Sequence, residues 1–365
     1  AVGNTLYFLA NNDVNGTELW KSDGTDAGTM MVKDIIVGAS GSFPTNLIAI
    51  DSTLYFVANN KLWKSNGTDP TTVGDTSVGI YSNPNNLTAV GTTLYFSAYD
   101  NTAGYELWTS NTVPTAFTSV QRVKDIYAGA TGSSNPQSLT AVGGTLYFLA
   151  NDGINDIEVW KSDGTDTGTV VVKNIHAAQS SNPQFLTALA GSLYFSAHDG
   201  VRGAELWKSD GTQAGTVLVK DITVGANGSD LSNLTVVGTT LYFQGYSNNN
   251  AGYELWKSDG TDSGTVMVKD IYTGGNHSSP VNLTAVGSTL YFLANNGITG
   301  TELWKSNGTE AGTVMVKDIY SGANGSSPSY LVAVGNTLYC GAEESCSGRA
   351  LPQTKPSPAI CRITL

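Results

Sequence analysis

The chain has 365 residues, of which 40% are hydrophobic and only 13% are charged, and it contains 17 Tyr, 10 Phe and 7 Trp. Disordered chains combine low hydrophobicity with high charge, so this composition indicates a folded protein. A formal net charge of −12 excludes a nucleic-acid partner, which needs clustered Lys and Arg. No apolar run reaches the ~18 residues of a membrane-spanning helix.

One unit of about 47 residues recurs from end to end of the chain. Its best-kept copy, residues 282–328, contains four short apolar runs: LTAV, TLYFLA, ELWK and TVMVKDI. Turn residues separate these runs, which are too short for helices, so each run predicts a strand. All seven Trp fall at one repeat position: Trp20, Trp63, Trp108, Trp160, Trp207, Trp256 and Trp304. Four antiparallel strands per unit are typical of a β-propeller blade.

Along the chain, the units differ most near both ends. The first begins at Ala1, where its first strand is cut short, the second is shortened, and the third has a rebuilt hairpin. The last, residues 329–365, is divergent and lacks the Trp, and its segments GRALPQ and ICRITL align with the third and fourth strands. We therefore predict an all-β, closed β-propeller of eight four-stranded blades in a single domain, residues 1–365. Seven blades plus a terminal appendage is the alternative.

The run ELWKSDGTDSGTVMVKDI, residues 254–271, resembles the bacterial ELWxxDGT repeat family, and the likeness extends to about residue 342. This family occurs in secreted and cell-surface proteins. The resemblance therefore implies a propeller that is secreted or exposed on the cell surface. It implies no catalytic residues, because the family has none established.

The Asp-Gly-Thr segments are candidate turns or candidate calcium loops. They contain Asp23, Asp163, Asp210 and Asp259, with Asn66 and Asn307 at the same position. Asx-Gly is a strong hairpin-turn signal, whereas calcium needs six to eight oxygen ligands. Because Asn replaces Asp without loss of the unit, we predict turns and no cofactor, with calcium as the alternative.

The other candidate chemical groups are carboxylates and histidines. A Glu precedes Leu-Trp, or Val-Trp, in six units: Glu18, Glu106, Glu158, Glu205, Glu254 and Glu302. A catalytic carboxylate pair should be singular, so we interpret these repeated residues as cross-strand ion pairs with a neighbouring Lys. His176, His198 and His277 lie in different units without metal-ligand spacing, which argues against a zinc site. We predict no metal, no catalytic residues and no enzymatic activity.

The three cysteines all lie in the divergent last unit. In the predicted blade, Cys340 lies in the second strand and Cys361 in the fourth, about 10 Å apart at the usual strand spacing. A disulfide requires Cα atoms within about 7 Å. Cys346, in the loop between them, is therefore predicted to form a disulfide with Cys340 or Cys361, leaving one free thiol.

Aromatic residues suggest two further features. The Trp row favours packing between blades, with a repeated inter-blade ligand pocket as the alternative. The loop after the second strand and the crossover between blades are expected on one face, where the sequence varies most and Tyr is frequent. Rigid aromatics among small polar residues suit recognition, although turns alone require such Asn and Gly. The predicted ligand-binding residues are Tyr105, Tyr127, Tyr253, Tyr272 and Tyr320.

These observations predict an extracellular, non-catalytic binding propeller that recognises a glycan or another surface ligand through its loop face. The alternative is a structural or adhesion subunit of a cell-surface or extracellular assembly. The expected partner is an extracellular glycan or a surface protein, and oligomerisation is left open.

Overall fold

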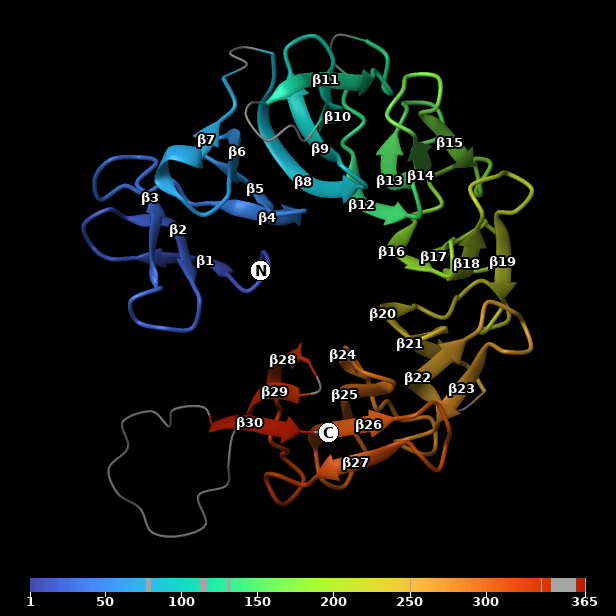
Figure 1. Cartoon of the computed structure of the whole chain (residues 1–365). Coiled ribbons are helices and arrows are strands. Elements are labelled where there is room, and N and C mark those ends of the chain that lie inside the picture. Colours follow the sequence, from blue (N-terminus) through green and yellow to red (C-terminus); the bar gives the residue numbers. More distant parts are fainter. Residues whose placement is uncertain are drawn as a thin grey trace. The chain divides into compact units, whose positions relative to one another are not determined.

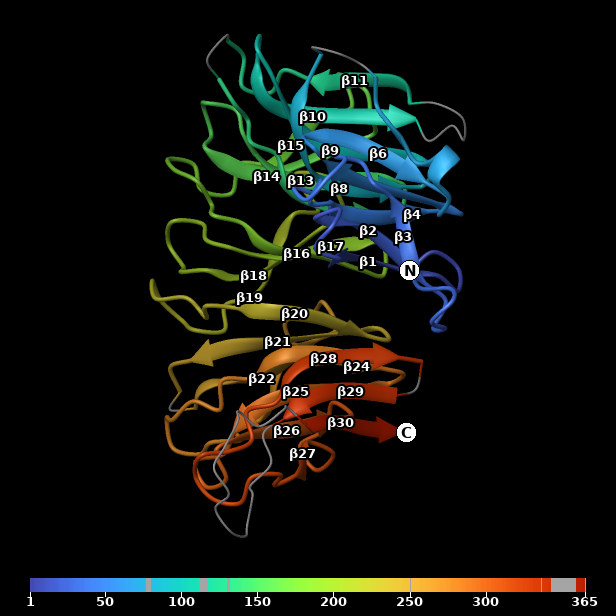
Figure 2. The same ribbon diagram turned by 90° about the vertical axis from the view of Figure 1, so that its left-hand side faces the viewer.

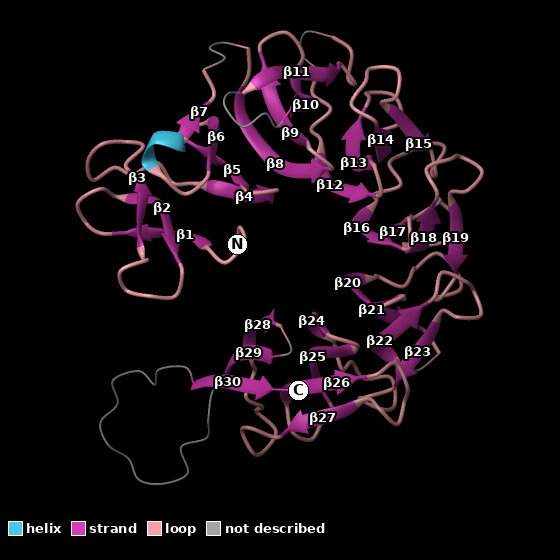
Figure 3. Ribbon diagram, in the orientation of Figure 1, coloured by secondary structure: helices cyan, strands magenta, loops and turns pink. Residues whose placement is uncertain are grey.

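The computed structural model describes residues 1–76, 80–111, 117–129, 132–249, 251–335, 337–342 and 359–364. These residues form eight antiparallel sheets, one for each repeat, of which six have four strands and two have three (Figure 1). Strands and loops make up this described part except for one short 3-10 helix (Figure 3). Within it, no helix is long and apolar enough to cross a membrane. The all-β propeller class and the eight blades are confirmed, whereas ring closure stays a prediction.

The chain divides into two compact units, Ala1–Asn174 with Ala178–Ser180, and Ile175–Ala177 with Ser181–Leu365. The first unit contains blades 1 to 4. Blade 1 has β1 (Leu6–Asn11), β2 (Thr17–Ser22) and β3 (Met30–Lys33), and blade 2 has β4 (Thr45–Ile50), β5 (Thr53–Ala58), β6 (Lys61–Ser65), η1 (Asp69–Thr71) and β7 (Val73–Gly74). Blade 3 has β8 (Ser82–Val90), β9 (Thr93–Asp100), β10 (Gly104–Asn111) and β11 (Thr118–Lys124), and blade 4 has β12 (Gln137–Val142), β13 (Thr145–Asn151), β14 (Ile157–Ser162) and β15 (Val170–Lys173).

The second unit contains blades 5 to 8, and Figure 2 shows its strands β20, β21 and β22 in succession. Blade 5 has β16 (Gln184–Leu189), β17 (Ser192–Ala197), β18 (Glu205–Ser209) and β19 (Val217–Lys220), and blade 6 has β20 (Ser232–Val237), β21 (Thr240–Ser247), β22 (Gly252–Ser258) and β23 (Val266–Lys269). Blade 7 has β24 (Val281–Val286), β25 (Thr289–Asn295), β26 (Thr301–Ser306) and β27 (Val314–Lys317), and blade 8 has β28 (Ser329–Val334), β29 (Thr337–Ala342) and β30 (Ala359–Thr364).

Blade 8 corrects the predicted place of its last strand. β30 pairs directly with β29, so the segment aligned with the fourth strand occupies the third position of the sheet. The register places Cys340 opposite Cys361, and the argument that two strands separate these residues was therefore wrong. Cys340 is buried, and Cys346 lies outside the described residues, so the disulfide of Cys346 stays a prediction.

The core lies between successive blades and is built by the repeated aromatic residues. Within the units, β4 contacts β8, β8 contacts β12, β16 contacts β20, β20 contacts β24 and β24 contacts β28. In blade 6, Trp256 on β22 lies opposite Phe243 on β21, and it packs against Leu189 and Tyr194 of blade 5. Trp160 and Trp304 pack on their preceding blades in the same way. The interpretation of the Trp row as packing between blades is confirmed.

The Asp-Gly-Thr segments are turns. In blade 6, the Asp259 Oδ1 atom accepts hydrogen bonds from the Thr261 backbone N–H at 2.9 Å and from its hydroxyl at 2.7 Å. Asn307 accepts the corresponding pair from Thr309 in blade 7. An Asx side chain thus closes each turn through a carbonyl or carboxylate oxygen, which explains why Asn and Asp are interchangeable here.

The repeated Glu holds the connection to the next blade. Glu254 is fully buried and accepts hydrogen bonds from the Ile271 N–H at 2.9 Å, from the Ser278 N–H at 3.0 Å and from the Ser278 hydroxyl at 2.5 Å. We call this arrangement the glutamate staple. Hydroxyl-to-carboxylate bonds of the same kind join four further pairs: Ser42 to Glu18, Ser134 to Glu106, Ser229 to Glu205, and Ser326 to Glu302.

The staple corrects the predicted ion pair between Glu and Lys. The Lys at the end of the fourth strand instead reaches a turn Asp in the next blade, as in Lys33 with Asp69 at 2.6 Å and Lys220 with Asp262 at 2.9 Å. These pairs are exposed and contribute little to stability. The Glu side chain is buried and bonds to the connection between blades, whereas the Lys side chain lies at the surface and pairs with an exposed Asp.

We predict that Ser278→Ala lowers the free energy of unfolding by about 1–3 kcal/mol, because a buried carboxylate loses a hydrogen-bond donor. Urea denaturation measures this change. Ser263→Ala, in the exposed turn of the same blade, is the matched control and should change the value by less than about 0.5 kcal/mol. Equal effects of the two substitutions would contradict the staple.

Candidate functional site

A cavity of about 440 Å³ opens in the first unit, where the beginnings of β4, β8 and β12 meet the turn after β5. Small-molecule sites have volumes of roughly 300–1,000 Å³, so this one is at the lower end of that range. We call it the amide pocket, because Asn and Gln dominate its lining. Its residues are Thr45, Asn46, Val57, Asn60, Asn83, Pro84, Asn85, Asn86, Ser97, Tyr105, Asn135, Pro136 and Gln137.

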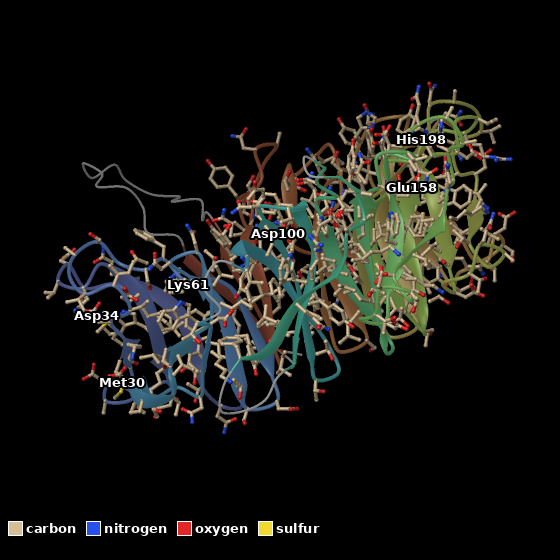
Figure 4. The ribbon with its side chains drawn as sticks, turned by 90° about the horizontal axis from the view of Figure 1, so that it is seen from above. Met30, Asp34, Lys61, Asp100, Glu158 and His198 are labelled. Carbon is tan, nitrogen blue, oxygen red and sulfur yellow. The ribbon has the colours of Figure 1, made fainter. Side chains whose placement is uncertain are left out.

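The pocket exists because blade 2 has a shorter loop than the other blades. Its β5 and β6 are joined by Asn59 and Asn60 alone, with φ angles of 47° and 58°. Two consecutive left-handed residues make a tight hairpin turn, and Asn tolerates this conformation. Lys61, labelled in Figure 4, follows this turn at the position that Glu occupies in blade 1 and in blades 3 to 7. Blade 2 therefore has neither the long loop nor the glutamate staple.

The first strand of blade 3 also departs from the repeat. β8 is nine residues long and its pairing with β9 shifts twice, between Ser82 and Asn85 and between Asn85 and Thr88. Asn83 and Asn86 adopt φ angles of 50° and 54°, as the residues at the same two positions do in other blades, for example Asp230 at 43° and Asn233 at 57°. Such bulges turn the side chains of a strand away from the regular alternation. Several amides at the beginning of β8 consequently line the pocket.

Hydrogen bonds between amides in the lining of the pocket link three blades. The Asn46 Nδ2 atom of blade 2 donates to Asn85 Oδ1 of blade 3 at 2.9 Å, and that oxygen also accepts the Asn86 N–H at 2.8 Å. Asn86 Nδ2 then donates to the Pro136 carbonyl at the start of blade 4 at 3.1 Å. The chain of amides fixes the lining of the pocket across blades 2, 3 and 4.

Other amides of the pocket remain free to bind a ligand. Asn60, Asn83 and Gln137 are exposed, and within the described part of the chain their side chains have no hydrogen-bond partner. Each side-chain amide offers donors and an acceptor. The lining contains no Asp, Glu, Lys, Arg or His. This arrangement suits an uncharged ligand that is itself rich in donors and acceptors.

The five predicted tyrosines do not form one site. Tyr105 lines the amide pocket and packs against Tyr99, with ring centroids 5.3 Å apart. Tyr253 packs against Tyr246 at 5.1 Å, and its hydroxyl donates to Asp230 at 3.0 Å.

Tyr127 and Tyr272 have a packing role. A Cβ at Gly153 would lie 2.5 Å from the Tyr127 ring, and one at Gly297 would lie 2.4 Å from the Tyr272 ring. These rings thus lie flat against a loop of the next blade. Tyr320 is half-buried, and no ring contact among the described residues joins any two of the five. Ligand binding by the five tyrosines as a group stays a prediction.

The structure brings together two histidines that the sequence placed in different repeats. The rings of His176 and His198 are 5.0 Å apart in a cavity of about 380 Å³ within the second unit, beside Gly200 and Arg202. No group of three His, Cys, Asp or Glu side chains that could hold a metal occurs among the described residues. We assign no metal to this pair.

The repeated glutamates are too deeply buried to act on a substrate. Burial raises the pKa of Glu106 and Glu254, against the opposing effect of their hydrogen bonds. Burial, aided by the nearby Asp221 carboxylate, raises the pKa of Glu205 to about 7. A raised carboxyl pKa is common in active sites, but here each Glu is fully buried and bonded to the chain connection. Their function is structural.

No protein-family model matches this chain, and no curated protein matches it either. The resemblance to ELWxxDGT repeats and the secreted location therefore stay predictions.

Among solved structures, the chain is similar to a prolyl endopeptidase whose inter-domain dynamics were studied for their role in catalysis and specificity. The TM-score is 0.52 at 12% identity, and the match covers 86% of this chain and 48% of that chain. It is also similar to prolyl oligopeptidase B from Galerina marginata, with a TM-score of 0.48, 11% identity and coverage of 88% and 49%. At this identity the likeness shows the fold, and the chain spans about half the length of these proteins.

This likeness contradicts the predicted function. We expected a non-catalytic propeller that recognises a glycan or surface ligand, or an adhesion subunit, but the solved structure that this chain matches with a TM-score of 0.52 is that of a prolyl endopeptidase. The Tyr-rich loops led to that prediction because surface Tyr is frequent at binding sites. In the structure, two of the five tyrosines pack against glycines of the next blade.

We predict that the stability of the protein falls as the pH rises from about 4.5 to about 7 through the Glu205 carboxyl. The folded chain holds this proton more tightly than the unfolded chain, so the stabilisation is complete below pH 4.5 and is lost through pH 7. Urea denaturation of the wild type and of Glu205→Gln across this range measures the effect. Identical pH dependence in the two proteins would show that Glu205 does not titrate there.

Proposed function

We propose that this chain is a peptide-binding propeller that works together with a peptidase, and that the amide pocket is its peptide site. The observation that carries the proposal is the uncharged, amide-lined cavity in the first unit. A peptide backbone presents one N–H donor and one carbonyl acceptor per residue, which are the groups that Asn and Gln side chains pair with.

The solved structures support the association with peptidases. The matching propeller of the prolyl endopeptidase makes up about half of that chain, so a propeller of this kind occurs there beside further protein. We propose that this chain supplies the propeller and does not itself cleave peptides. The deep burial of the repeated glutamates supports this, because a substrate has no access to them.

We expect the chain to bind an uncharged, acetylated and amidated peptide in isothermal titration calorimetry and to leave it intact in mass spectrometry after prolonged incubation. Gln137→Trp should abolish binding, because the indole occupies the cavity. Gln184→Trp is the matched control, since Gln184 occupies the same repeat position at the beginning of β16 and lies outside the pocket.

Two results would contradict this proposal. Absence of binding to the wild type, or equal binding by the two tryptophan variants, would remove the amide pocket as the peptide site. Cleavage of the peptide by the purified chain would show that the chain itself carries the catalytic groups.

A further inference from the structure

We propose that the amide pocket selects peptide segments that carry Asn or Gln side chains and rejects charged residues. This inference rests on the proposed function and specifies its substrate class. It follows from the absence of charge in the lining, from the hydrogen-bonded chain of amides, and from the free amides beside that chain.

The uncharged lining sets the first part of the selectivity. A charged side chain that enters the cavity loses part of its hydration and finds no opposite charge among the lining residues. This cost applies to Asp and Glu and equally to Lys and Arg. The negative net charge of the protein, in contrast, acts in opposite directions on acidic and basic peptides.

The chain of amides sets the second part. Asn46, Asn85 and Asn86 already show how one side-chain amide donates to the oxygen of another and how an amide donates to a backbone carbonyl. A ligand amide can extend this pattern, because it donates and accepts at once, like Asn60 and Asn83 beside it. An ionised carboxylate of the same shape only accepts hydrogen bonds. It therefore offers no donor to the acceptor oxygens of the pocket, and its own oxygens are repelled by them.

The apolar part of the lining accommodates the rest of such a side chain. Pro84 and Pro136 are buried at the base of the pocket, and Val57 is 8% exposed beside them. The methylene groups of Gln can contact these surfaces while its amide reaches Asn60, Asn83 or Gln137. The pocket thus combines a small apolar base with an amide rim.

The repeat itself provides a variant that tests the charge of the lining. Asn83 has a φ of 50°, and Asp230 occupies the corresponding position in blade 6 with a φ of 43°. Since Asp adopts this conformation there, Asn83→Asp changes the charge of the pocket and keeps the backbone. Ser279→Asp, at the same position in blade 7 with a φ of 46°, is the matched control outside the pocket.

The test uses three acetylated and amidated peptides, Gly-Ser-Xaa-Xaa-Ser-Gly, with Gln, Glu or Lys at both Xaa positions. Calorimetry at about 0.5 M salt suppresses the long-range field of the protein. We expect the Gln peptide to bind at least tenfold more tightly than both others. Asn83→Asp should weaken the Gln peptide at least tenfold and strengthen the Lys peptide, whereas Ser279→Asp should change neither.

The outcomes separate this inference from the proposed function. Equal binding of the three peptides overturns the selectivity and leaves the peptide site in place. Preference of the wild type for the Lys peptide also overturns it, because the negative net charge of the protein would then determine which peptide binds. Failure of all three peptides to bind overturns the proposed function itself.

Discussion

The hydrogen bonding of a buried carboxylate near the start of the Trp-bearing strand is the interaction on which the rest of this structure depends. The connection between two blades is a loop without regular hydrogen bonds, and its backbone amides need acceptors in the interior. Glu106 supplies them, since it is fully buried and accepts hydrogen bonds from the Ile126 N–H at 3.0 Å, the Ser134 N–H at 3.1 Å and the Ser134 hydroxyl at 2.6 Å. Burial of a charge is unfavourable unless such bonds offset it. The staple therefore ties the loop between blades 3 and 4 to β10, the strand that carries Glu106.

Blade 2 lacks this glutamate, and it is also the blade where the pocket opens. In blade 2, Lys61 occupies the Glu position, and the hairpin before it consists of two Asn residues. In the connection from blade 2 to blade 3, the Tyr81 hydroxyl instead donates a hydrogen bond to the Asp75 carboxylate. Because the loop between β5 and β6 is short, it leaves a space that amides of blades 3 and 4 line. Repetition builds the fold here, and a local break in the repetition creates the site.

Much of the fold could be predicted from the sequence, because each repeat carries its own strand and turn signals. The pairing of Phe243 with Trp256 and the Asx turns needed only information within one repeat. The predictions that failed concerned partners outside it. Glu254 bonds to Ser278, which lies in the connection to the next blade, and Lys33 reaches Asp69 in the next blade. Periodicity gives the spacing of such residues but not the neighbour that each one faces.

The amide pocket escaped prediction for the same reason. Asn46, Asn86 and Pro136 belong to three different repeats, and each of these Asn residues alone is an ordinary turn or bulge residue. The shortened hairpin at Asn59 and Asn60 was visible in the sequence, and it is the signal that marks an uncovered blade. The predicted separation of Cys340 and Cys361 was wrong because the alignment to the repeat assigned β30 to the fourth strand, whereas its register makes it the neighbour of β29.

Hydrogen exchange at the Ile271 and Ser278 amides tests the central claim most directly, because both donate to the buried Glu254 carboxylate. The account predicts that these two loop amides are protected as strongly as the amides of β22 in the same blade. Exchange at the rate of Gly274, an exposed glycine of the same connection, would contradict the claim that the glutamate staple holds successive blades together.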